Sequence, residues 1–147
     1  MIDIPSDPEF EPFRAACRRH ELAVQECTSC GRLQWPPRPI CGYCYSMRTS
    51  WTPVSGQGAL FSWTVVHRAH SPEYRQEVPY VIALAGLAED PGVRLLARGD
   101  GLTEPGLRPG LAVAVSFHEH GNGIVLPYWA PAGHASAGQA SAGQVGP

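Results

Sequence analysis

Four of the five cysteines in this chain lie in one stretch, CTSCGRLQWPPRPICGYC. They form two Cys-x-x-Cys pairs, Cys27 with Cys30 and Cys41 with Cys44, and ten residues separate the pairs. Two tight turns that each present two thiolates can supply all four tetrahedral ligands of a zinc ion. Three prolines between the pairs exclude a helix there. The spacing therefore predicts a rubredoxin-like zinc ribbon at residues 27–50, with one zinc ion per chain.

The residues alone leave two other uses of these thiols open: disulfides or free thiols, and thioredoxin-like redox chemistry. A reducing cytosol disfavours disulfides, and the βαβ pattern that surrounds a redox Cys-x-x-Cys is missing. With cysteine at all four positions, a bound zinc ion has no open position for water, so we expect a structural ion. Gly31 and Gly42 each follow a cysteine directly, where a knuckle needs tight or left-handed backbone.

Residues 1–26 predict a short helix followed by a lead-in strand at 22–25. Ser6 and Glu9 have the spacing of a capping box, and a proline between them suits a first helical turn. A helix this short persists only when it packs on another element. Three apolar side chains recur at helical spacing and share the face that would pack: Phe10, Phe13 and Cys17.

Residues 51–130 predict an all-β domain. Five segments rich in β-branched or aromatic residues are separated by turns with glycine, proline or aspartate. Five short strands in a segment of this length favour a small closed barrel over a seven-stranded sandwich. Trp63 is expected in its core, and Gly56 and Gly58 are expected at a bulge or bend. The predicted strands are 59–69, 79–88, 93–100, 111–120 and 123–129.

Charge and composition restrict the class of protein further. The chain carries 13 acids and 11 bases, all of them arginine, for a net charge of −2. This is a poor match to a general nucleic-acid binder, which shows a basic surface. The charge is uneven, because residues 27–50 hold three arginines and no acid. Residues 131–147 are low in complexity and repeat ASAGQ, so we expect a disordered tail.

The start of the sequence has no basic segment followed by an apolar stretch, as a secretory signal would. No apolar run approaches the roughly 18 residues that span a bilayer. We therefore expect a soluble, cytoplasmic protein with no membrane contact.

The order of motifs over residues 8–130 resembles the bacterial and archaeal zinc-ribbon/OB-fold proteins associated with acyl-CoA enzymes, formerly a domain of unknown function. The resemblance implies a mainly β architecture: an N-terminal helix, the zinc ribbon, then a five-stranded OB-fold barrel. The cysteine pairs alone are common to many families, and their order with SWTVVHRA is more specific. The motifs are CxxCG at 27–31, PPR at 36–38, CxxC at 41–44, GxG at 56–58, SWTVV at 62–66, PYV at 79–81, Gly110 before LAVAVSF, and LP at 126–127.

The resemblance also implies a function. Members of this family are similar to accessory subunits or fused domains of thiolases, lipid-transfer-protein-like aldolases and acyl-CoA hydratases. It therefore implies a non-catalytic subunit with a thiolase-fold or hydratase partner and an acyl-CoA ligand, in steroid or fatty-acid degradation. The alternative is a nucleic-acid-binding zinc-ribbon/OB protein, whose binding would weaken steeply with salt.

Seven side chains are candidates for contact with acyl-CoA or the partner. Aromatic side chains can cover an acyl chain or stack on a base, and arginines can pair with phosphate. We expect the ligand between the N-terminal helix and the barrel, and partner docking on the outer face of the ribbon. The candidates are Phe10, Phe13, Arg32, Trp35, Arg38, Arg68 and Tyr80.

No catalytic residue is predicted, because the spacing brings no nucleophile together with a base. His67 and His70 flank an arginine after the first barrel strand, and we interpret them as a solvated strand end. His118 and His120 alternate along a later strand, and a metal site there would need further converging ligands. We interpret them as surface residues.

Overall fold

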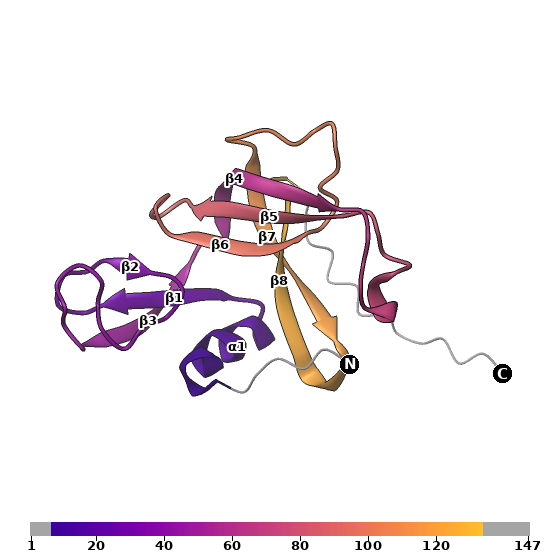
Figure 1. The fold of residues 1–147 in the computed structure, drawn as a ribbon. Coiled ribbons are helices and arrows are strands. Elements are labelled where there is room, and N and C mark those ends of the chain that lie inside the picture. The colour runs from indigo at the N-terminus through magenta and orange to yellow at the C-terminus, as the bar shows by residue number, and fades with distance from the viewer. Residues whose placement is uncertain (1–6, 134–147) are drawn as a thin grey trace.

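The computed structural model describes residues 7–133 (Figure 1). The chain begins with the 3-10 turn η1 (Pro8–Phe10) and continues as the helix α1 (Glu11–Arg18). The carboxylate of Asp7 accepts a hydrogen bond from the Glu9 backbone N–H at 3.0 Å and caps the turn. Ser6, the predicted capping residue, lies outside the described residues.

The predicted packing face of α1 is confirmed in part. Phe13 and Cys17 are buried, while Phe10 stays half-exposed and Ala16 completes the buried face. This face packs on strand β1 of the ribbon and strand β8 of the barrel. The helix thus joins the two domains, which explains how eight residues remain helical.

The ribbon is a small antiparallel sheet with strand order β2-β1-β3. Its strands are β1 (Leu22–Cys27), β2 (Leu33–Gln34) and β3 (Thr49–Val54). The sheet therefore reaches beyond the predicted cysteine section on both sides, because β3 pairs with β1 along its whole length, from Leu22 opposite Val54 to Cys27 opposite Thr49.

The second domain is a closed five-stranded barrel with strand order β4-β5-β6-β8-β7. All neighbouring pairs are antiparallel except β6 and β8, which run parallel. The predicted fold, a helix and zinc ribbon followed by a five-stranded OB-fold barrel, is confirmed. Its strands are β4 (Gln57–Val66), β5 (Tyr80–Leu87), β6 (Arg94–Gly99), β7 (Ala112–His120) and β8 (Ile124–Pro131).

One hydrophobic cluster runs through both domains, from Phe13 and Val24 to the barrel interior. Its centre is Trp129, which is fully buried and donates its indole N–H to the Leu95 carbonyl at 3.0 Å. Trp63 packs against this cluster but is only half-buried. Because helix, ribbon and barrel share apolar contacts, their relative positions are fixed by packing.

The predicted bend near the head of the first barrel strand is displaced. Gly56 does adopt a left-handed conformation (φ +74°), but the bulge lies between Leu60 and Ser62. Gly58 has a different role, because a β-carbon there would lie 2.5 Å from the Gly86 carbonyl oxygen of β5. The two strands can approach this closely only without a side chain.

The predicted tail lies, from residue 134 onward, outside the described residues. Among those that the structure describes, no helix is long and apolar enough to cross a membrane.

Candidate functional site

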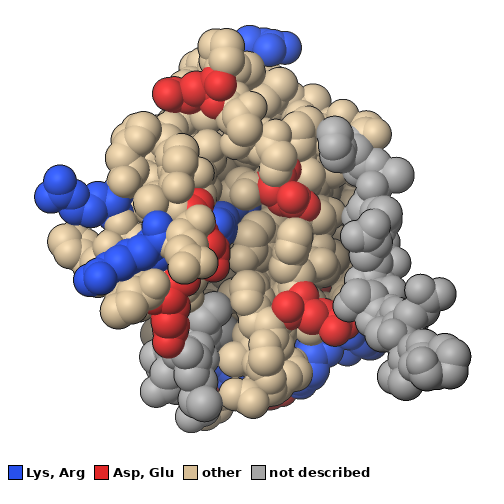
Figure 2. Space-filling model, turned by 90° about the vertical axis from the view of Figure 1, so that its right-hand side faces the viewer, with Lys and Arg blue, Asp and Glu red and all other residues tan. Residues whose placement is uncertain are grey.

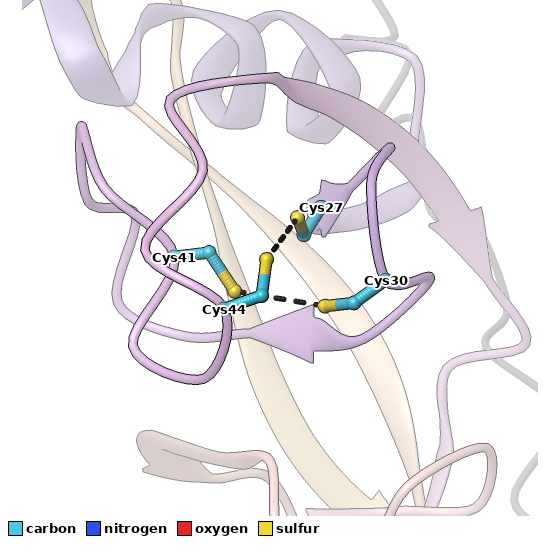
Figure 3. Close-up of side chains that lie close together, drawn as sticks. All are labelled: Cys27, Cys30, Cys41 and Cys44. Atoms are coloured by element: carbon cyan, nitrogen blue, oxygen red, sulfur yellow. Dashed lines mark hydrogen bonds between the residues drawn. The ribbon is translucent and has the colours of Figure 1, made fainter.

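The four knuckle cysteines converge on one point (Figure 3). Their sulfur atoms all lie within 4.8 Å of one another, with Cys27 and Cys44 3.6 Å apart and Cys30 and Cys41 3.7 Å apart. Zinc–sulfur bonds of about 2.3 Å in a tetrahedron place sulfur atoms about 3.8 Å apart. The sulfur positions therefore fit one zinc ion. The separations are far longer than the roughly 2.05 Å of a disulfide.

The two knuckles repeat the same hydrogen bonds. Gly31 N–H donates to the Cys27 carbonyl at 2.7 Å, and Tyr45 N–H donates to the Cys41 carbonyl at 3.1 Å. In each case the donor follows the second cysteine of its pair and has a left-handed backbone, with φ +72° for Gly31 and +59° for Tyr45. Gly42 lies in the tight turn of the second knuckle, as expected, but the left-handed residue of that knuckle is Tyr45.

The backbone favours thiolate at the first cysteine of each pair. At Cys44, by contrast, a backbone hydrogen bond from Ser46 is outweighed by burial and the neighbouring cysteines, which raise the pKa to about 11. Hydrogen bonds from the backbone N–H groups of Cys30 and Ser29 lower the pKa of Cys27 to about 6 despite its burial. Backbone N–H groups of Cys44 and Tyr43 likewise lower the pKa of Cys41. Thiolate is the form that binds metal. With four cysteine ligands the ion has no vacant position, so the centre is structural.

A cavity of about 770 Å³ opens where helix, ribbon and barrel meet. Phe13 of α1 and Trp35 of the ribbon form one wall. Their ring centroids lie 4.6 Å apart, and the angle between the ring planes is 46°. Barrel side chains such as Ile82 and Leu126 form the apolar remainder. This is within the usual size of small-molecule sites, and it lies between the N-terminal helix and the barrel, where the sequence analysis places the ligand.

Another part of the cavity lining is polar. Arg98 pairs with Glu77 and lies over the ring of Tyr80, 4.3 Å from its centroid. Beside them, the Tyr128 hydroxyl is 3.2 Å from Nε2 of His120. Burial and the neighbouring His118 lower the pKa of His120, so its imidazole is neutral at pH 7.

The structure brings some of the seven contact candidates together. Phe13, Trp35 and Tyr80 line the cavity, and Phe10 packs edge-on against Trp35 with ring centroids 5.8 Å apart. Arg68 is exposed in the loop that follows β4. Their contact with acyl-CoA stays a prediction.

The two contact candidates that are ribbon arginines, Arg32 and Arg38, lie outside this cavity, around the second knuckle. Arg32 stacks on Tyr43 at 4.2 Å from the ring centroid. The Arg38 guanidinium lies beside Gly42, where an added β-carbon would be 3.5 Å from Nη1. Tyr43 itself is exposed, so it does not shield the metal centre from solvent.

Sequence reasoning missed a polar cluster on β7. Both the Ser116 hydroxyl and Nε2 of His118 reach the same oxygen of Asp100, at 2.9 and 2.8 Å. A catalytic triad instead needs serine and aspartate on opposite imidazole nitrogens. The cluster therefore has the geometry of a structural network.

Two family models match this chain: the rubredoxin-like zinc ribbon domain of ChsH2 over residues 14–47, and its C-terminal OB-fold domain over residues 51–118. The chain belongs to the ChsH2 zinc-ribbon/OB-fold family. A chain of the Ltp2-ChsH2(DUF35) aldolase superimposes with a TM-score of 0.80 at 28% identity, covering 88% of this chain and 99% of that one.

Curated relatives carry two kinds of name. This chain is 32% identical to a probable enoyl-CoA hydratase alpha subunit of Thermomonospora curvata and 33% identical to the 3-oxo-4,17-pregnadiene-20-carboxyl-CoA hydratase alpha subunit of Mycobacterium tuberculosis. Each match covers 80% of this chain, but 35% and 34% of the relative. A DUF35 domain-containing scaffold protein of Pyrococcus furiosus is 41% identical over 51% of this chain and 54% of its own length. The chain thus spans a third to about half of these relatives.

Proposed function

We propose that this chain is a non-catalytic accessory subunit of an acyl-CoA enzyme in steroid or fatty-acid degradation. It binds a thiolase-fold enzyme, either a thiolase or a lipid-transfer-protein-like aldolase, or an acyl-CoA hydratase, and helps to hold or shield the acyl-CoA. The observation that carries the proposal is the likeness, over nearly the whole chain, to a chain of the Ltp2-ChsH2(DUF35) aldolase. The hydratase and scaffold names of the relatives support the same class.

The charges of the residues that line the cavity indicate which part of an acyl-CoA binds there. The charged lining residues are Glu73, Glu77 and Arg98, two acids against one base, and the base already pairs with Glu77. Such a wall repels the phosphates of coenzyme A and suits an uncharged moiety. The acyl group or the pantetheine arm therefore occupies the cavity. The phosphates lie outside it, where Arg68 on the β4–β5 loop is available to them.

Direct catalysis by this chain has little geometric support. Among the described residues, the cysteine site is coordinatively closed, and the Ser116–His118–Asp100 cluster lacks the geometry of a triad. The polar cavity wall holds a neutral histidine and an ion pair rather than an activated nucleophile. Holding the substrate for a partner's active site is the role that this wall supports.

The nucleic-acid alternative has weaker support. The face that carries the β4–β5 loop shows acidic and basic side chains interspersed in a largely uncharged surface (Figure 2). An OB-fold that follows a nucleic-acid backbone presents a continuous basic groove, and a net charge of −2 does not favour one.

Co-expression with a thiolase-fold or hydratase subunit from the same organism, chosen first from genes that neighbour this one, tests the proposal. We expect the two proteins to co-purify and the enzyme to gain acyl-CoA affinity or activity. A partner that is soluble and fully active alone, and that never co-purifies, would contradict it.

Two variants separate substrate binding from assembly. Ala97→Phe fills the cavity from β6, whereas Ala112→Phe adds the same ring at an exposed position on β7. Ala97→Phe should leave the complex assembled but weaken acyl-CoA binding about tenfold or more, as expected when a buried contact of about 1.4 kcal/mol is lost. Ala112→Phe should leave acyl-CoA binding unchanged. Equal effects of the two variants would place the ligand elsewhere.

A further inference from the structure

The second knuckle exposes an unusual amount of apolar surface. Of the six large hydrophobic side chains that are exposed in the described part of the chain, four lie within residues 40–47. We name this set the knuckle surface: Ile40, Tyr43, Tyr45 and Met47, with exposed fractions of 46%, 58%, 79% and 73%. The turn that carries them is compact, because Cys41 N–H donates to the Ser46 carbonyl at 2.9 Å.

Tyr45 is the most informative member. It occupies the left-handed position that Gly31 holds in the first knuckle, with the same hydrogen bond to the first cysteine of the pair. A side chain in this conformation costs stability that glycine would not. The residue is 79% exposed, so its side chain gains little from packing within this chain. Such strain at an exposed aromatic residue is characteristic of a functional position.

Arginines surround the knuckle surface. Arg32 lies 4.2 Å from the Tyr43 ring centroid, and Arg38 lies beside Gly42. Arg48 donates to the Ser29 hydroxyl at 3.0 Å, and that hydroxyl is 2.7 Å from the Ser46 hydroxyl of the second knuckle.

This arrangement specifies the chemistry of a partner. Tyrosine, methionine and arginine are enriched in protein–protein interfaces, and exposed apolar groups rimmed by charge mark interaction sites. The complementary surface has an apolar centre with an acidic rim. A second copy of this chain does not fit, because two arginine-rimmed, acid-free surfaces would repel each other.

We propose that the knuckle surface is the docking site of this chain on its enzyme partner, and that Tyr45 is its anchor. The partner presents an apolar pocket bordered by aspartate or glutamate. This inference rests on the proposed function, since it assigns the surface through which that assembly forms. It narrows the docking face that the sequence led us to expect on the ribbon to the second knuckle, with Tyr45 as the central contact.

The test uses the full zinc-loaded chain and the co-expressed enzyme subunit, with the dissociation constant measured by calorimetry or surface plasmon resonance. Tyr45→Gly should raise the dissociation constant about tenfold or more, as loss of an interface tyrosine does. Its midpoint of unfolding should stay equal or rise, since glycine relieves the left-handed strain. Phe61→Ala is the matched control, because Phe61 is a 52% exposed aromatic residue on β4 of the barrel.

The outcomes separate this inference from the one on which it rests. If the wild-type proteins do not bind each other, the proposed function fails. If they bind and Phe61→Ala weakens the complex while Tyr45→Gly does not, the barrel docks and the knuckle proposal is overturned. Two further results would overturn the knuckle proposal in favour of another occupant. The first is self-association of the wild-type chain that is lost in Tyr45→Gly. The second is salt-sensitive binding of an oligonucleotide that is lost in the same variant.

Discussion

Replacing Cys30 by alanine tests whether the four thiols act as one metal site. Cys30 is exposed, so its packing alone predicts almost no loss of stability. A structural zinc ion changes this expectation, because such ions contribute about 10–16 kcal/mol to folding, an average of about 2.5–4 kcal/mol for each of four ligands. Cys30→Ala should therefore lower the free energy of unfolding by about 3 kcal/mol or more.

Cys17→Ala is the matched control, since Cys17 is the remaining cysteine and is fully buried. Removing a small buried side chain costs about 1 kcal/mol. Burial alone thus predicts that Cys17→Ala is the more damaging change, whereas a zinc site predicts the reverse. The order of the two variants decides between these explanations without reliance on absolute values.

The loss of zinc should also reach the cavity. Trp35 lies in the segment between the cysteine pairs, and its ring contacts both Phe13 and Phe10. When the ribbon loses its metal, this ring is no longer held against α1, and one wall of the cavity is lost. We therefore expect metal removal to abolish acyl-CoA binding, although zinc itself does not line the cavity.

Elemental analysis and chemical denaturation under reducing conditions measure both effects. Wild type and Cys17→Ala should carry about one zinc per chain, and Cys30→Ala should carry less and unfold at lower denaturant. If Cys30→Ala keeps its full zinc content, or is less destabilised than Cys17→Ala, the four thiols do not form a single metal site.

Three further outcomes follow from local geometry. Gly58→Ala should destabilise the barrel by about 2 kcal/mol or more, because its β-carbon would lie 2.5 Å from a β5 carbonyl; Gly121→Ala, with nothing within 4 Å, should be nearly neutral in the same denaturation assay. Burial raises the pKa of Cys17 to about 11, so in zinc-loaded protein at pH 8 it should resist a thiol reagent that labels the denatured chain. Burial raises the pKa of Glu89, but hydrogen bonds from Ser55 outweigh this and lower it overall. Its contribution to stability should therefore be full above the ordinary value of 4.5 and lost as pH falls through the lower folded value; Glu89→Gln should flatten this dependence in acid melts.

The metal centre and the strand order along the chain were predictable because they depend on local signals. Two Cys-x-x-Cys pairs can converge on one ion whatever surrounds them. The barrel strands carry β-branched and aromatic residues between turn signals, so the five predicted segments each overlap one observed strand. Which residue takes the left-handed position was not predictable from glycine alone. In the second knuckle that position falls on Tyr45, and only the hydrogen-bond pattern identifies it.

The polar wall of the cavity could not be predicted, because its members come from separate elements. Glu77 precedes β5, Arg98 lies on β6 and Tyr128 on β8. They meet because the barrel closes through the parallel pairing of β6 with β8, which places Arg98 opposite Tyr128. No periodicity in the sequence encodes that pairing. The aromatic wall was easier to predict from the sequence, because Phe13 lies on a helical face that must pack.

The position of the ribbon explains how a closed zinc site can matter for function. Between the two cysteine pairs the chain contributes Trp35 to the cavity wall, and in the second knuckle it exposes Tyr45 to solvent. Both side chains are carried by backbone that the same four cysteines hold in place. Zinc therefore fixes the spacing between the proposed substrate surface and the proposed docking surface. A partner that binds Tyr45 would therefore hold the cavity at a defined position relative to its own active site. A ribbon without metal would lose both the cavity wall and the docking surface.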